Sequence, residues 1–133
     1  AFEHRISALV VNPGQFDPME NIKRASQNED GEERNIDLNA FFQAAMQDKF
    51  VASKFKAKMY VHGAEDPLEV VNQWENYNLR DVAHLIKCPT LVADAENEHL
   101  SAGQAKELFD ALTCPKDYIL FTNLEGCGDH CGA

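Results

Sequence analysis

Three short apolar runs, separated by polar and turn-forming residues, limit this chain to a small set of folds. They cover residues 5–12 (RISALVVN), 90–95 (TLVADA) and 117–123 (DYILFTN), and a proline lies next to or close to each run. Continuous runs of aliphatic and β-branched residues are typical of strands that are buried on both faces, as in parallel sheets. We therefore expect an α/β fold with three parallel strands.

A helix is predicted between the second and third runs. In residues 101–112, Ser101 has the character of an N-cap, and Gln104 three positions later completes a capping box. An apolar stripe recurs at helical spacing, formed by Ala105, Leu108, Phe109 and Leu112. Strand, helix and strand within roughly 30 residues predict a right-handed βαβ unit.

The middle of the chain has a different character. Residues 20–37 are polar and mostly acidic, which indicates an exposed loop or a frayed helix, and helices are predicted over 37–50, 66–77 and 79–86. We therefore divide the chain into an α/β core of residues 1–17 and 87–133 and a helical insertion of residues 18–86. Insertions of this size over a parallel sheet are typical of lids and substrate pockets.

Charge and hydropathy exclude several classes of partner. The formal net charge is −10, from 22 acidic and 12 basic residues, which disfavours nucleic acids and anionic membrane surfaces. No apolar run is long enough for a transmembrane helix, and the N-terminal residues lack the pattern of a secretory signal peptide. The four cysteines are too sparse for a secreted disulfide scaffold, so we expect reduced thiols in a cytoplasmic protein.

The first apolar run is expected to need a further strand. Its central residues, 8–11 (ALVV), contain no lysine, proline or bulge signal that would protect a free sheet edge. Three parallel strands also make a small sheet for an independent domain. We therefore expect a partner strand from outside these residues, as in a piece of a longer protein.

Carboxylates and a histidine follow two of the predicted strands. Asp94, Glu96 and Glu98 come after the second strand, and His130 comes after the third, within EGCGDHCGA (125–133). In open α/β sheets, functional groups gather at the carboxyl ends of the strands. A carboxylate can bind one ring nitrogen of the histidine and leave the other nitrogen free to take a proton.

These residues resemble part of a known superfamily. The segment 87–100 (KCPTLVADAENEHL) resembles the strand and turn that carry the acid of the catalytic triad in α/β-hydrolases, and 126–133 (GCGDHCGA) resembles their histidine loop. The resemblance is to the C-terminal portion of the cap-bearing branch, with residues 18–86 as the cap. That branch includes fermentation-respiration-switch esterase-like proteins, dihydroxypseudooxynicotine hydrolases and fungal yellowish-green-pigment polyketide hydrolases.

The resemblance implies a function. His130 would be the triad base and Glu98 the acid, for serine-type hydrolysis of an ester or a ketone C–C bond in a polyketide-like or aromatic small molecule. Glu98 stands where aspartate is commoner, so Asp94 and Glu96 remain competitors for the acid. The chain contains no G-x-S-x-G motif, so the nucleophile is expected upstream of residue 1, in the N-terminal remainder of the hydrolase fold. Whether the parent protein is a homodimer is left open.

Two other interpretations remain. The missing nucleophile also fits a catalytically inactive, hydrolase-like binding module whose helical segment docks a partner. Zinc would need about four ligands, of which Cys127, His130 and Cys131 supply three, and Cys88 or Cys114 could supply another. The chain has no C-x-x-C pair, which disfavours both zinc and a redox site. We therefore predict neither a metal nor a cofactor.

Overall fold

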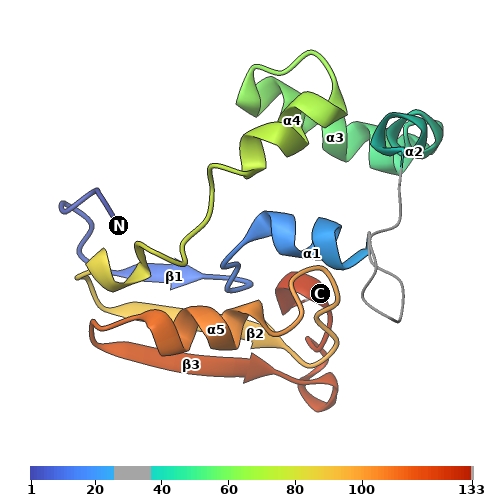
Figure 1. The fold of residues 1–133 in the computed structure, drawn as a ribbon. Coiled ribbons are helices and arrows are strands. Elements are labelled where there is room, and N and C mark those ends of the chain that lie inside the picture. The colour runs from blue at the N-terminus through green and yellow to red at the C-terminus, as the bar shows by residue number, and fades with distance from the viewer. Residues whose placement is uncertain (26–36, 133) are drawn as a thin grey trace. The chain divides into compact units, whose positions relative to one another are not determined.

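The structure, a computed structural model, describes residues 1–25 and 37–132. Contacts divide the chain into two compact units (Figure 1). The sheet unit consists of Ala1–Pro18 and Asn78–Ala133, and the helical unit consists of Met19–Tyr77. Residues 79–86, which the sequence analysis placed at the end of the insertion, therefore lie with the sheet.

The sheet unit is built on three parallel strands, as predicted. They are β1 (Leu9–Val11), β2 (Thr90–Ala95) and β3 (Lys116–Phe121), in the order β1-β2-β3. Leu9 pairs with Thr90, and Thr90 pairs with Lys116 on its other side. Helix α5 (Gln104–Ala111) connects β2 to β3, which completes the predicted βαβ unit (Figure 1). The fold class is therefore α/β with a parallel sheet.

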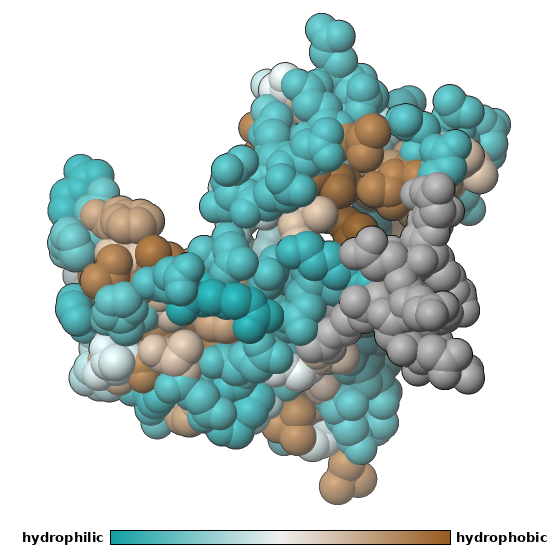
Figure 2. All heavy atoms as spheres, in the orientation of Figure 1, coloured by the Kyte–Doolittle hydropathy of each residue, from teal (hydrophilic) through white to brown (hydrophobic). Residues whose placement is uncertain are grey.

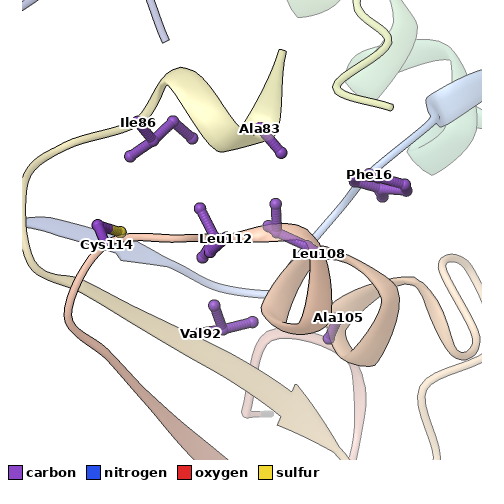
Figure 3. Packing of buried hydrophobic residues seen from close by; sticks show 8 residues of the cluster. All are labelled: Phe16, Ala83, Ile86, Val92, Ala105, Leu108, Leu112 and Cys114. Atoms are coloured by element: carbon purple, nitrogen blue, oxygen red, sulfur yellow. The ribbon is translucent and has the colours of Figure 1, made fainter. Parts of the chain in front are cut away.

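The core of the sheet unit lies between one face of the sheet and α5. Val92 of β2 and Leu108 of α5 are almost inaccessible to solvent, and Figure 3 shows them at the centre of the apolar cluster. The buried members of the cluster are Phe16, Ala83, Ile86, Val92, Ala105, Leu108, Leu112 and Cys114. Ala83 belongs to a short 3₁₀ turn, Ala83–Leu85, which is shorter than the helix predicted over 79–86.

The expectation that all three strands are buried on both faces is wrong within the described residues. Nearly all of β2 is buried, but Val10 of β1 is 65% exposed and Ile119 of β3 is 39% exposed. Alternate side chains of a strand point to opposite faces, so Val10 and Ile119 lie on the face opposite to Val92. Helix α5 covers the Val92 face, and the other face is left partly open to solvent.

The predicted capping box of α5 is also wrong. The helix begins at Gln104, after Gly103 with φ of 79°, and Ser101 makes no capping hydrogen bond. The buried Gln104 side chain instead accepts hydrogen bonds from the backbone amides of Phe16 and Asp17, at 2.9 and 2.8 Å. A long-range contact therefore takes the side chain that the local motif would have used, and it fastens the loop after β1 to α5.

The helical unit contains α1 (Pro18–Ala25), α2 (Leu38–Ala45), α3 (Lys49–His62) and α4 (Pro67–Trp74). The single helix predicted over 37–50 is divided because the Asp48 side chain accepts from the amides of Phe50 and Val51 and so caps α3. The loop predicted over 20–37 is helical up to Ala25, and its remainder lies outside the described residues. Most of α3 was not predicted.

A second apolar cluster holds the helical unit together. Phe42 of α2 and Val71 of α4 are buried in it with Met19 of α1. Phe42 and Phe55 of α3 meet edge to face, with ring centroids 5.2 Å apart. None of the helices in the described residues combines the length and hydropathy that crossing a bilayer requires.

Candidate active site

Two loops lie side by side at the carboxyl end of the sheet, because β2 and β3 are neighbours. The acid loop is residues 96–101, after β2, and the histidine loop is residues 122–132, after β3. The Glu96 amide donates to the Phe121 carbonyl at 2.9 Å, and the Asn97 amide donates to the Gly128 carbonyl at 2.8 Å. Backbone pairing therefore continues beyond the strands and sets the two loops against each other.

His130 and Glu98 are in contact. Nδ1 of His130 lies 2.6 Å from Oε2 of Glu98. The Glu98 side chain is 2% exposed, whereas the His130 side chain is 35% exposed. Nε2 of His130 has no hydrogen-bond partner among the residues that the structure describes. The two residues singled out from the sequence are thus brought together, with the second ring nitrogen of the histidine open to an incoming group.

The acid is held by its own loop. Oε1 of Glu98 accepts from the backbone amides of Leu100 at 2.7 Å and Ser101 at 2.9 Å. Burial opposes ionisation of Glu98, but the two amides and His130 together outweigh it and lower the pKa of this carboxyl below its ordinary value. Glu98 is therefore an ionised acceptor at neutral pH, and Nδ1 of His130 carries the proton.

The two competing carboxylates point elsewhere. Asp94 accepts the hydroxyl of Tyr118 at 2.7 Å and the amide of Ala95 at 2.9 Å. Burial and the contact with Asp94 raise the pKa of Tyr118 to about 12. Glu96 accepts the amide of Asn123 at 2.8 Å. Within residues 1–25 and 37–132, Glu98 is therefore the carboxylate that contacts the imidazole.

The histidine loop has an unusual backbone at Cys131. This residue has φ of 62°, a left-handed conformation that costs a non-glycine residue about 1–2 kcal/mol. Asn12, just after β1, donates from Nδ2 to the Cys131 carbonyl at 3.3 Å and accepts from Sγ of Cys131 at 3.8 Å. Backbone strain of this kind clusters at functional sites. Loops that follow all three strands therefore meet beside His130.

Several polar residues of the site were not singled out from the sequence. Nδ2 of Asn97 donates to Oδ1 of Asn123 at 2.8 Å and to Oδ1 of Asp129 at 3.0 Å. Gly128 approaches so closely that a Cβ there would lie 2.7 Å from the amide nitrogen of Asn123. Asparagine after a strand is a common turn residue, so a single sequence carries no signal for this network.

Two other residues close to the strand ends have different surroundings. Asp17 accepts from Nδ2 of Asn78 at 3.0 Å and lies 3.7 Å from Nε of Arg80, among residues of the sheet unit that are not in the two loops. His99 approaches the carbonyl of Asn97 at 3.2 Å, and its ring centroid is 6.5 Å from that of His130. These hydrogen bonds of Asp17 and His99 are thus made with residues other than His130.

The metal and redox interpretations find no geometric support in the described part of the chain. All four cysteines are free thiols, and Cys127 and Cys131 are not joined. In residues 1–25 and 37–132, no three side chains of histidine, cysteine, aspartate or glutamate are grouped as metal ligands.

The chain was compared with known families and proteins. No protein-family model, curated protein or solved structure matches it. The chemistry of the site is therefore inferred from its own side chains: an ionised buried carboxylate, a half-exposed imidazole and a free Nε2.

Proposed function

We propose that this chain is the C-terminal part of a serine-type α/β-hydrolase of the cap-bearing kind. His130 is the general base and Glu98 is the triad acid. The observation that carries the proposal is the contact of 2.6 Å between Nδ1 of His130 and the buried carboxylate of Glu98 at the carboxyl end of a parallel sheet.

The geometry suits proton transfer at Nε2. Because Glu98 accepts the proton-bearing Nδ1, the lone pair of the neutral ring lies on Nε2. Nε2 takes the proton of a serine hydroxyl as that oxygen attacks a carbonyl, and it then returns the proton to the leaving group. Water cleaves the resulting acyl-enzyme by the same route, and Glu98 stabilises the imidazolium each time it forms.

The serine would come from outside residues 1–133, carried by a strand next to β1. Two observations support room for such a strand. In the described chain, β1 pairs with β2 alone, and Val10 of β1 is 65% exposed. An upstream strand along β1 would place its carboxyl end beside Asn12 and the histidine loop, where a nucleophile could reach Nε2.

The helical unit is proposed to be the cap that selects the substrate. It is inserted between β1 and β2, and it contains a hollow of about 560 Å³, a size suited to a small molecule. Phe42, Met46, Pro67 and Leu68 supply apolar lining, and Asn39, Gln43, Gln47 and Asp66 supply polar groups. An ester or a ketone with an aromatic, polyketide-like body is the proposed substrate class.

The proposal is tested by labelling the product of the complete gene with a fluorophosphonate, which reacts with activated serines. We expect one labelled serine upstream of Ala1, with labelling greatly slowed by His130→Ala. His84→Ala, which removes an exposed histidine of the sheet unit, is the matched control and should label normally. If the protein is not labelled, or if the His130 variant is labelled at the normal rate, the proposal is wrong.

A second candidate, the inactive binding module, is favoured by one observation. No residue of α3, all of which is described, is buried, and Phe50, Tyr60 and Val61 are 68%, 89% and 79% exposed. Figure 2 shows apolar atoms reaching the surface among hydrophilic ones on one face of the molecule. Exposed apolar residues on a helix mark docking surfaces. If the complete gene product resists labelling but captures a partner that Tyr60→Ser abolishes, this second candidate replaces the first.

A further inference from the structure

The acid loop and the histidine loop touch at two successive positions. Glu98 contacts His130, and Asn97, the residue before Glu98, contacts Asp129, the residue before His130. Both contacts span 32 positions of the chain. The second contact is a hydrogen bond of 3.0 Å from Nδ2 of Asn97 to Oδ1 of Asp129. The His130 contact therefore has a neighbouring polar contact that fastens the same two loops.

Asn97 holds the histidine loop at three places. Its amide donates to the Gly128 carbonyl at 2.8 Å, and its side chain donates to Asp129 and also to Oδ1 of Asn123 at 2.8 Å. Gly128 is buried against Asn123, so this end of the loop has little room to shift. His130 follows directly and is half-buried, and Nδ1 is the ring atom through which the described chain holds it.

We propose that Asn97 is a positioning residue for His130. Asn97 touches no reacting atom; it fixes the backbone from which the imidazole projects, so that Nδ1 faces Glu98 and Nε2 stays free. The inference rests on the proposed function only in the value it gives to that orientation. The fastening itself can be measured in this chain without any enzymatic assay.

The chemistry of the three groups predicts an asymmetric response. Asp129 and Oδ1 of Asn123 are acceptors, and the side-chain amide of Asn97 is the donor between them. Asn97→Asp keeps the size of the side chain but replaces the donor with a charge that repels Asp129. Asp129→Asn can rotate its amide and still present an oxygen to Asn97. In the double variant, the amide introduced at position 129 donates to the carboxylate introduced at position 97, so the contact is restored with its polarity reversed.

The test is nuclear magnetic resonance of the chain with isotope-labelled histidine at neutral pH, with His130→Ala used to assign the signals. In the parent chain we expect a slowly exchanging Nδ1–H signal from His130 and nitrogen shifts of the Nδ1-protonated tautomer. Asn97→Asp should lose this signal and mix the tautomers, Asp129→Asn should keep it, and the double variant should recover it. Asn72→Asp, an exposed position on α4, is the matched control and should keep it.

Two results would overturn the inference: retention of the Nδ1–H signal in Asn97→Asp, or its loss in the double variant as in the single one. If dispersion of the backbone amide signals shows that Asn97→Asp is unfolded, the uncharged Asn97→Ala takes its place, with the same opposed outcomes. Glu98→Gln separates the two proposals. A signal that survives Glu98→Gln means that the His130–Glu98 pair is absent, whereas a signal lost with Glu98→Gln but kept with Asn97→Asp contradicts Asn97 alone.

Discussion

His130 and Glu98 stand 32 positions apart in the chain, and Nδ1 of one lies 2.6 Å from Oε2 of the other. The contact arises because the strands that precede them, β3 and β2, are parallel neighbours, so that their following loops begin at the same edge of the sheet. The carboxylate is buried and fixed by two backbone amides, while the imidazole is half-exposed. A fixed acid beside an accessible base is the arrangement that general base catalysis needs.

Glu98→Gln should make the folded chain less stable and less sensitive to acid. Because the pKa of Glu98 is lowered by folding, its contribution is complete above the ordinary glutamate pKa of about 4.3 and is lost as the pH falls through the lower folded value. Loss of charged hydrogen bonds should cost about 2 kcal/mol at neutral pH. Urea unfolding from pH 7 down to pH 3 measures this.

The control for that experiment is Glu75→Gln, at an exposed position after α4. It should leave both the free energy of unfolding and its pH dependence close to those of the parent. If Glu98→Gln behaves like this control, the carboxylate is not fixed in the way that the structure describes.

Tyr118 should ionise far above the other tyrosines. Its raised pKa, about 12, reflects burial and the contact with Asp94. Because the folded pKa is raised, the contribution of Tyr118 to stability is complete below the ordinary tyrosine pKa of about 10 and is lost as the pH rises through about 12. An ultraviolet titration should show one late tyrosine that is absent from Tyr118→Phe. A parent chain whose three tyrosines all titrate near pH 10 would contradict this.

Much of the sheet could be predicted from the sequence, because local signals coincide with its elements. Residues 90–95 form β2 as expected, since an apolar run directly follows Pro89. The capping box at Ser101 failed because Gln104 is occupied by the amides of Phe16 and Asp17, about 88 positions away, and no local rule contains such a contact. Exposure of Val10 was mispredicted because burial depends on what covers the strand, not on the strand itself.

The site divides in the same way. The position of Glu98 and His130 after neighbouring strands could be predicted, and so could the type of contact. The choice of Glu98 over Asp94 and Glu96 could not, because it depends on where each side chain finds a hydrogen-bond donor. The role of Asn97 depends on the spacing between two loops, which the chain order does not reveal.

Cys131→Gly should stabilise the sheet unit by about 1 kcal/mol. The substitution removes the steric cost of a non-glycine residue at φ of 62°, although glycine also gives the unfolded chain more freedom. The side chain is exposed, so little packing is lost. Thermal and urea unfolding provide the measurement, and a clear loss of stability would show that the contact of Cys131 with Asn12 outweighs the strain.

Gly128→Ala should destabilise the chain by about 1–3 kcal/mol and displace the histidine loop. The added Cβ would lie 2.7 Å from the amide nitrogen of Asn123 and would press on the side chain that Asn97 holds. Gly126→Ala is the comparison, because a Cβ there meets nothing within 4 Å and only its φ of 76° is unfavourable. Amide chemical shifts of the loop should change widely in the first variant and locally in the second. Equal effects would argue against the close approach at Gly128.

The central claim, that His130 is the base of a hydrolase completed by an upstream serine, is tested most directly by the turnover of the complete gene product on activated aromatic esters. Replacement of His130 by alanine should lower kcat by about 10³-fold or more, because the serine then has no proton acceptor. Turnover close to that of the parent enzyme in this variant would contradict the account.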